Sequence, residues 1–123
     1  RLMKEKPALG VVGDQVGTPT WAKGLAERCW AAVQQRIEGT YHWTDAGVAS
    51  WYDFAVAIQR AGLELGLLDA EIPIDSIPSD AYPTPAKRPA YSVLDKSRMI
   101  EALGVKPTHW QAQLQLMMKE WVE

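Results

Sequence analysis

The strongest constraint on the fold is an apolar segment, a turn and a helical pattern that follow one another near the start of the chain. Residues 8–12 (Ala-Leu-Gly-Val-Val) predict a short strand, and the glycine-bounded stretch 13–17 predicts a turn. After this turn, apolar residues recur at helical spacing until Gly39. The apolar positions of this predicted helix are Ala22, Leu25, Ala26, Cys29, Val33 and Ile37.

Two neighbouring segments extend this pattern. Thr18-Pro19-Thr20 offers a hydroxyl N-cap and a proline for the first turn of the helix. Residues 40–44 are aromatic and β-branched and predict a second strand, which Asp45-Ala46-Gly47 breaks. The succession of strand, helix and strand predicts an α/β fold with about four helices and a few short strands.

The middle of the chain predicts a second helix and a weaker strand. Ser50 and Asp53 have the spacing of a capping box, with Asp in place of Glu, at the start of a helix that ends at Gly66. Residues 72–77 alternate between apolar and polar, but Pro73 restricts this segment to an edge strand or an extended loop.

The last third of the chain predicts a short strand and two more helices. The strand covers residues 90–94, and Asp95 can cap a helix that ends at Gly104. A final helix starts at Thr108, with Gln111 completing a capping box. Its aligned apolar residues are Trp110, Leu114, Met117, Met118 and Trp121.

Composition excludes several classes of protein. The length of 123 residues fits one domain. The formal net charge of −2 argues against the basic surface that nucleic-acid-binding proteins use to contact phosphates. No apolar run is long enough to span a bilayer, and residues 1–6 do not open a signal peptide, so we expect a cytoplasmic protein without membrane contact. The single cysteine, Cys29, is expected to be buried on the apolar face of its helix.

The chemistry-bearing residues do not form a complete catalytic or metal-binding set. Gly10, Gly13 and Gly17 differ by one position from the dinucleotide fingerprint, so a tight strand-to-helix turn is favoured over a cofactor site. No tyrosine is followed four residues later by lysine, the pair that activates a phenol in short-chain dehydrogenases. His42 and His109 are too few for a metal cluster. We therefore expect no catalytic residue, no metal and no cofactor on this chain alone.

Arg88 is the best candidate for a ligand contact. It lies in residues 82–89, where three prolines predict a stiff loop that preorganises a guanidinium for phosphate oxygens. From composition alone, a surface ion pair is the more common role of a lone arginine. The polar turn 14–20 lies at the C-terminal end of a strand, which is where α/β sheets bind ligands, although taken alone it indicates only a turn.

Several motifs together resemble the dTDP-4-dehydrorhamnose reductase family, in matching order and approximate spacing from about residue 9 to 121. They are Asp14-Gln15-x-Gly17-Thr18-Pro19-Thr20 with Leu25-Ala26, Gly39-Thr40-Tyr41-His42, Ser50-Trp51-Tyr52-Asp53-Phe54-Ala55, and Tyr82-Pro83-Thr84-Pro85-Ala86-Lys87-Arg88-Pro89-Ala90-Tyr91-Ser92-x-Leu94-Asp95.

The resemblance implies an extended short-chain dehydrogenase, with an N-terminal Rossmann domain that binds NADPH and a smaller C-terminal portion that closes over the nucleotide-sugar. Full-length members reduce the C4 ketone of dTDP-4-dehydro-L-rhamnose in dTDP-rhamnose biosynthesis, using a Tyr-x-x-x-Lys pair. Residues 1–123 would be the C-terminal substrate-binding portion, with the Rossmann portion and the catalytic residues outside them.

The same resemblance assigns substrate-side residues. Gln15, Gly17, Thr18 and Pro19 would face the nucleotide-sugar cleft, and Arg88 would correspond to an arginine that contacts the pyrophosphate. NADPH would belong to the full-length parent. An alternative is a non-catalytic regulatory or protein-interaction module with the same fold.

Strands that normally join a larger sheet would leave open edges in this chain. We therefore expect a homo-oligomer, with Val11, Val12 or Tyr41 in the contact.

Overall fold

The computed structural model describes residues 1–122 and has an α/β fold, as predicted. Within these residues, five α-helices, one short 3-10 helix (η1) and four short strands follow in the order α1 (Leu2–Glu5), β1 (Leu9–Val12), β2 (Val16–Gly17), α2 (Ala22–Gln34), β3 (Ala49–Ser50), α3 (Trp51–Glu64), β4 (Ile74–Ile77), η1 (Ser79–Ala81), α4 (Ser97–Leu103) and α5 (Trp110–Glu120). None of the described helices is long and apolar enough to cross a membrane.

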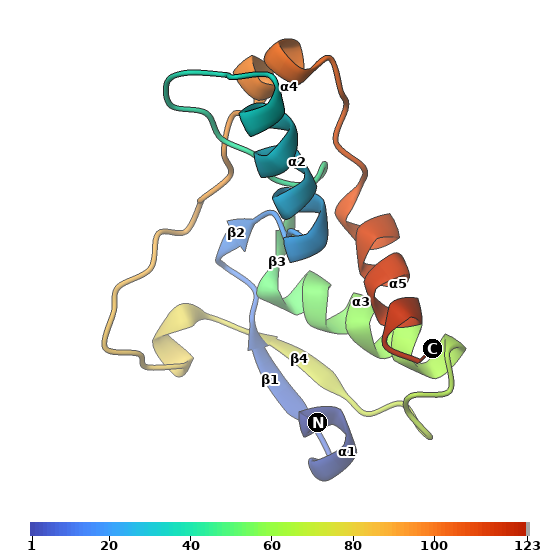
Figure 1. Cartoon of the computed structure of the whole chain (residues 1–123). Helices are drawn as coiled ribbons and strands as arrows, with labels where there is room; N and C mark the ends of the chain where they lie inside the picture. The colour runs from blue at the N-terminus through green and yellow to red at the C-terminus, as the bar shows by residue number, and fades with distance from the viewer. Residues whose placement is uncertain (123) are drawn as a thin grey trace.

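The strands predicted at 8–12 and 72–77 are present and pair with each other. β1 and β4 lie parallel, in a register that joins Leu9 to Ile74 and Val12 to Ile77 (Figure 1). Pro73 lies just before β4, so its missing amide hydrogen removes no hydrogen bond from the strand. Its carbonyl accepts a hydrogen bond from the amide of Leu9 at 3.0 Å. The proline therefore marks the start of the strand and is compatible with pairing.

α3 begins with the predicted capping box. The Ser50 hydroxyl oxygen accepts a hydrogen bond from the Asp53 amide at 3.0 Å, and the Asp53 carboxylate accepts one from the Ser50 amide at 2.8 Å. The helix packs on the β1–β4 pair and on α5. The buried core at this junction comprises Ala49, Ala61, Trp110, Leu114 and Met118.

α4 and α5 are present, but their starts differ from the prediction. α5 is capped by His109, whose side chain accepts a hydrogen bond from the Gln111 amide at 3.3 Å, so the box predicted from Thr108 is wrong. In α4, Asp95 accepts a hydrogen bond from the Ser97 amide at 2.9 Å, although the N-cap position is Lys96. α4 ends at Gly104 as predicted, with a left-handed φ of 65°.

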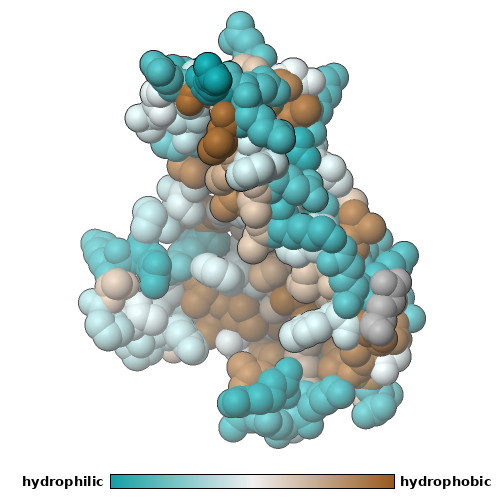
Figure 2. Space-filling view, viewed as in Figure 1, coloured by the Kyte–Doolittle hydropathy of each residue, from teal (hydrophilic) through white to brown (hydrophobic). Residues whose placement is uncertain are grey.

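α2 covers most of its predicted range, but its surroundings were predicted wrongly. The N-cap position is Trp21 and carries no side-chain cap, and the hydroxyl oxygen of Thr20 instead accepts a hydrogen bond from the Asp45 amide at 3.4 Å. The helix turns Gly24 inward, so its apolar stripe is at the surface (Figure 2). Cys29 is therefore exposed, where burial was expected. That stripe consists of Ala22, Leu25, Ala26, Cys29, Trp30 and Val33.

Residues 40–44 do not form the predicted strand. Among the described residues this segment has no strand partner, and it contacts side chains of two helices instead. The guanidinium of Arg98 in α4 lies 4.9 Å from the centre of the Tyr41 ring, and that of Arg28 in α2 lies 5.7 Å from the centre of the Trp43 ring. Of the strand predicted at 90–94, only a single parallel bridge between Tyr91 and Val16 forms.

Candidate functional site

The predicted turn lies at the carboxyl end of β1, where three other segments meet it. Within the predicted turn, Val16 and Gly17 form the short strand β2, which pairs antiparallel with Ser50 and Ala49 of β3. A side-chain carbon on Gly17 would lie 2.9 Å from the hydroxyl of Ser92, so the backbone approaches that neighbour too closely for a larger residue without a shift. Gly17 is thus part of a crowded junction.

Ser79 fixes the first half of the turn. The carboxylate of Asp14 accepts a hydrogen bond from the Ser79 amide at 3.0 Å and another from the Ser79 hydroxyl. These bonds, first that from the hydroxyl and then that from the amide, lower the pKa of Asp14. The side-chain amide of Gln15 donates to the Ser79 hydroxyl oxygen at 3.0 Å. Gln15, a predicted site residue, is therefore oriented by a serine that follows β4.

The second half of the turn is held from the other side. The Thr18 hydroxyl donates to the carbonyl of Gly47 at 2.9 Å. Asp45 is 1% exposed, and its carboxylate accepts a hydrogen bond from the amide of Trp21 at 3.0 Å. Thr18 and Pro19 therefore lie between two fixed points, the segment that contains Gly47 and the start of α2.

The proline-rich loop returns to the same turn. The amide of Val16 donates to the carbonyl of Ala90 at 2.8 Å, and the amide of Ser92 donates to the carbonyl of Val16 at 2.8 Å. Arg88, two residues before Ala90, is exposed, and it forms no ion pair with another of residues 1–122. The fold thus places the turn beside the end of the loop that carries Arg88, with the guanidinium open to solvent.

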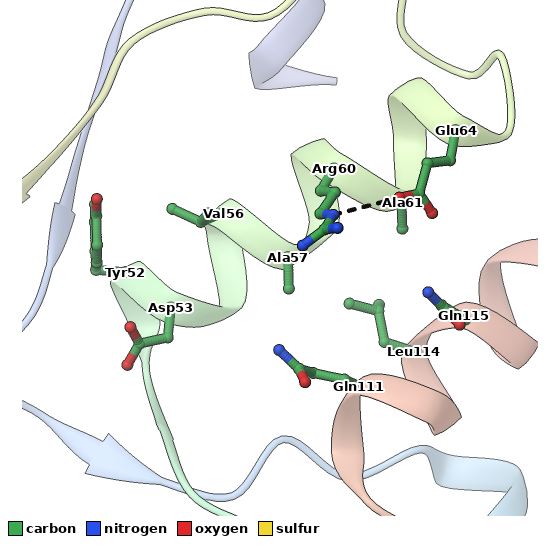
Figure 3. A pocket seen from close by; sticks show the side chains of 10 residues that line it. All are labelled: Tyr52, Asp53, Val56, Ala57, Arg60, Ala61, Glu64, Gln111, Leu114 and Gln115. Atoms are coloured by element: carbon green, nitrogen blue, oxygen red, sulfur yellow. Dashed lines mark hydrogen bonds and ion pairs between the residues drawn. The ribbon is translucent and has the colours of Figure 1, made fainter.

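A separate hollow lies between α3 and α5, away from the predicted residues. It has a volume of about 400 Å³ and is lined by Tyr52, Asp53, Val56, Ala57, Arg60, Ala61, Glu64, Gln111, Leu114 and Gln115 (Figure 3). Its charged groups already have partners, because Asp53 belongs to the capping box and Arg60 pairs with Glu64 at 3.3 Å. Arg88, by contrast, has no ion pair among residues 1–122, so the turn and loop remain the better candidate.

Sequence reasoning missed Ser79, Ser92 and Asp45. A signal for Ser79 exists in the strand register: Val12 pairs with Ile77, so Asp14 and Ser79, each two residues further on, come level with each other. Both strands were predicted, but their pairing was not. Among residues 1–122, no group of three His, Cys, Asp or Glu side chains is arranged to hold a metal.

Comparisons with known proteins all point to the same family. A family model described as "RmlD substrate binding domain" matches residues 1–123. The spore coat polysaccharide biosynthesis protein SpsK of Bacillus subtilis is 39% identical over 121 residues, covering 98% of this chain and 40% of its own length. A dTDP-4-dehydrorhamnose reductase of Aggregatibacter actinomycetemcomitans is 38% identical over 120 residues, covering 93% of this chain and 41% of its own.

Solved structures agree with this assignment. A dTDP-4-dehydrorhamnose reductase from Clostridium acetobutylicum has a TM-score of 0.85 and 36% identity, with 99% of this chain and 41% of that chain covered. The enzyme from Bacillus anthracis, solved in complex with NADP, has a TM-score of 0.84 and 26% identity, with 98% and 41% covered. The chain thus spans about two fifths of the length of the relatives it matches. It belongs to the RmlD substrate-binding domain family, the substrate-side portion of the dTDP-4-dehydrorhamnose reductases.

Proposed function

We propose that this chain is the nucleotide-sugar-binding portion of a cytoplasmic, NADPH-dependent dTDP-4-dehydrorhamnose reductase, and that it is not catalytic by itself. The observation that carries the proposal is the pairing at Val16, whose amide and carbonyl bond residues 90 and 92, so that the predicted turn lies beside the end of the loop that carries Arg88. The family match over residues 1–123 supports one substrate-binding unit.

The roles of the site residues follow from their chemistry. Arg88 would bind the pyrophosphate of the dTDP-sugar, because a guanidinium donates two parallel hydrogen bonds to phosphate oxygens. Arg88 is exposed and forms no ion pair with the residues that the structure describes, which is compatible with this role. Gln15, Gly17, Thr18 and Pro19 would line the side of the ligand, with Gln15 held in place by Ser79.

The rest of the parent protein would supply the chemistry. NADPH would donate the hydride to the C4 ketone, and residues outside this chain would hold the cofactor and donate the proton. The task of residues 1–123 would be to hold the nucleotide-sugar in reach of that cofactor.

Calorimetric titration of dTDP into the chain tests the proposal. We expect saturable binding that Arg88→Ala weakens about tenfold or more, since hydrogen bonds to charged groups contribute about 1.5–3 kcal/mol. Lys87→Ala is the matched control, because it removes a cation from the same loop and should change the affinity much less. Equal losses in both variants, or no binding by a folded chain, would contradict the proposal.

We also propose that the chain self-associates. In the described residues β1 and β4 pair only with each other, so each has one open edge, and the α2 stripe is at the surface. Tyr41 does not lie in a strand and is held by Arg98, which leaves Val11 and Val12 of β1 as the edge residues of the expected contact.

A further inference from the structure

The loop that carries Arg88 is tied at both ends to one short turn. Before the loop, Ser79 in η1 bonds Asp14 and Gln15; after it, Ala90 and Ser92 bond Val16. In Figure 1 the chain between these points runs as an open arc from η1, away from β1 and β2. Residues 14–16 are therefore the common anchor for both ends of the arc.

Between its two anchors the loop has little support of its own. Its residues 82–90 are exposed. Within this stretch the Thr84 hydroxyl donates a hydrogen bond to the Ala86 carbonyl at 2.9 Å, which is a local contact between residues two positions apart. Three prolines stiffen this stretch, so a displacement at one anchor is carried along the loop without being absorbed by local bending. The place of the Arg88 guanidinium is thus determined largely by the anchors.

We infer that Ser79 is a positioning residue for the phosphate contact of Arg88. One side chain performs two tasks: its hydroxyl and amide hold the loop against the Asp14 carboxylate, and its hydroxyl oxygen orients the Gln15 side chain. This inference rests on the proposed function, because it assigns to Ser79 the arrangement of groups that would bind the nucleotide-sugar.

The surroundings of Ser79 separate this role from one in core stability. Ser79 is partly exposed and lies outside the buried core around Trp110 and Leu114. The chain also contains a matched serine: Ser97 donates from its amide at 2.9 Å and its hydroxyl at 2.6 Å to Asp95 at the start of α4. Ser97→Ala removes the same kind of contact at a place that is not joined to the loop.

Hydrogen exchange of the ligand-free chain tests the anchor itself. Ser79→Ala should speed exchange about fivefold at the hydrogen-bonded amides of residues 79, 81, 82 and 92, the effect of losing a hydrogen bond worth about 1 kcal/mol. Ser79→Thr keeps a hydroxyl and should restore most of the protection, while Ser97→Ala should leave residues 79–92 unchanged. Unchanged exchange in Ser79→Ala would overturn the inference.

A double-mutant cycle with dTDP as the probe tests the link to Arg88. Ser79→Ala should weaken dTDP binding about fivefold in the wild-type background, but less than about twofold in the Arg88→Ala background, because the larger part of its effect passes through Arg88 and only the remainder through Gln15. Equal losses in the two backgrounds would overturn the inference and leave the proposed function standing. Loss of exchange protection without any effect of Arg88→Ala on dTDP would instead overturn the proposed function, and with it this role of Ser79.

Discussion

The carboxylate of Asp45 accepts a hydrogen bond from the backbone amide of Trp21 at 3.0 Å, across 24 residues of sequence, and Asp45 is only 1% exposed. This contact fixes the start of α2, where no side chain of the turn itself caps the helix. It therefore holds the end of the turn that contains Thr18 and Pro19.

Removing this contact should destabilise the fold. We expect Asp45→Ala to lower the free energy of unfolding by about 1–3 kcal/mol, because it leaves the Trp21 amide without its acceptor. Asp45→Asn keeps an acceptor oxygen and should cost less. Urea denaturation followed by tryptophan fluorescence measures both variants, and an Asp45→Ala variant as stable as the wild type would contradict this assignment.

Acid should weaken the start of α3 through Asp53. Hydrogen bonds from the backbone amide and then the hydroxyl of Ser50 lower the pKa of Asp53 below its ordinary value of 3.8. A carboxyl with a lowered folded-state pKa stabilises the fold above the unfolded-state value and loses that contribution as the pH falls through the folded-state pKa. Stability should therefore decrease below about pH 4, and more steeply for the wild type than for Asp53→Asn. Parallel curves of unfolding free energy against pH would argue against this role of Asp53.

Two glycines allow backbone strain to be separated from crowding. Gly47 has φ 83° and Gly66 has φ 67°, so alanine is strained at either position. At Gly47, the added carbon would also lie 2.4 Å from the ring nitrogen of His109, whereas nothing lies within 4 Å at Gly66. Gly47→Ala should thus lower the melting temperature clearly more than Gly66→Ala. Equal shifts would show that the ring of His109 moves aside without cost.

The open edge of β1 should support pairing between copies of the chain. Sedimentation velocity should show a concentration-dependent dimer, and Val12→Pro should shift it toward monomer. The amides of Leu9 and Gly13 donate to β4 and its flanks, so the alternation along the strand turns the amide of Val12 to the open edge, and proline removes that donor. Ala26→Asp places a charge in the α2 stripe and serves as the comparison. A wild-type chain that stays monomeric at high concentration, or a dimer sensitive only to Ala26→Asp, would contradict contact through β1.

Local signals in the sequence predicted α2 to α5 but not the short α1, and what they missed elsewhere depends on long-range contacts. The Ser50–Asp53 box and the glycine end of α4 depend on neighbouring residues, so their patterns were sufficient. Residues 40–44 have the composition of a strand, but β-propensity reflects packing, and cations from α2 and α4 hold this segment outside any sheet. The burial expected of Cys29 failed because α2 turns Gly24 inward.

The candidate site divides in the same way. Gln15, Gly17 and Arg88 could be selected from residue type and family resemblance, and the structure shows that the turn and the loop meet at Val16. Ser79 could not be selected, because its place beside Asp14 depends on the parallel register of two strands 65 residues apart. Pairing of distant strands has no local sequence pattern.

The most direct test of the central claim, that the turn and the Arg88 loop form one nucleotide-binding site, is to map dTDP binding by NMR on the ¹⁵N-labelled chain. We predict that the chemical shifts of the amides in residues 15–18 and 87–92 change together along one saturating curve. The chemical shifts of amides around the α3–α5 hollow, such as that of Gln115, should stay unchanged. Shifts that saturate around Gln115, or shifts of the turn without the loop, would contradict the account.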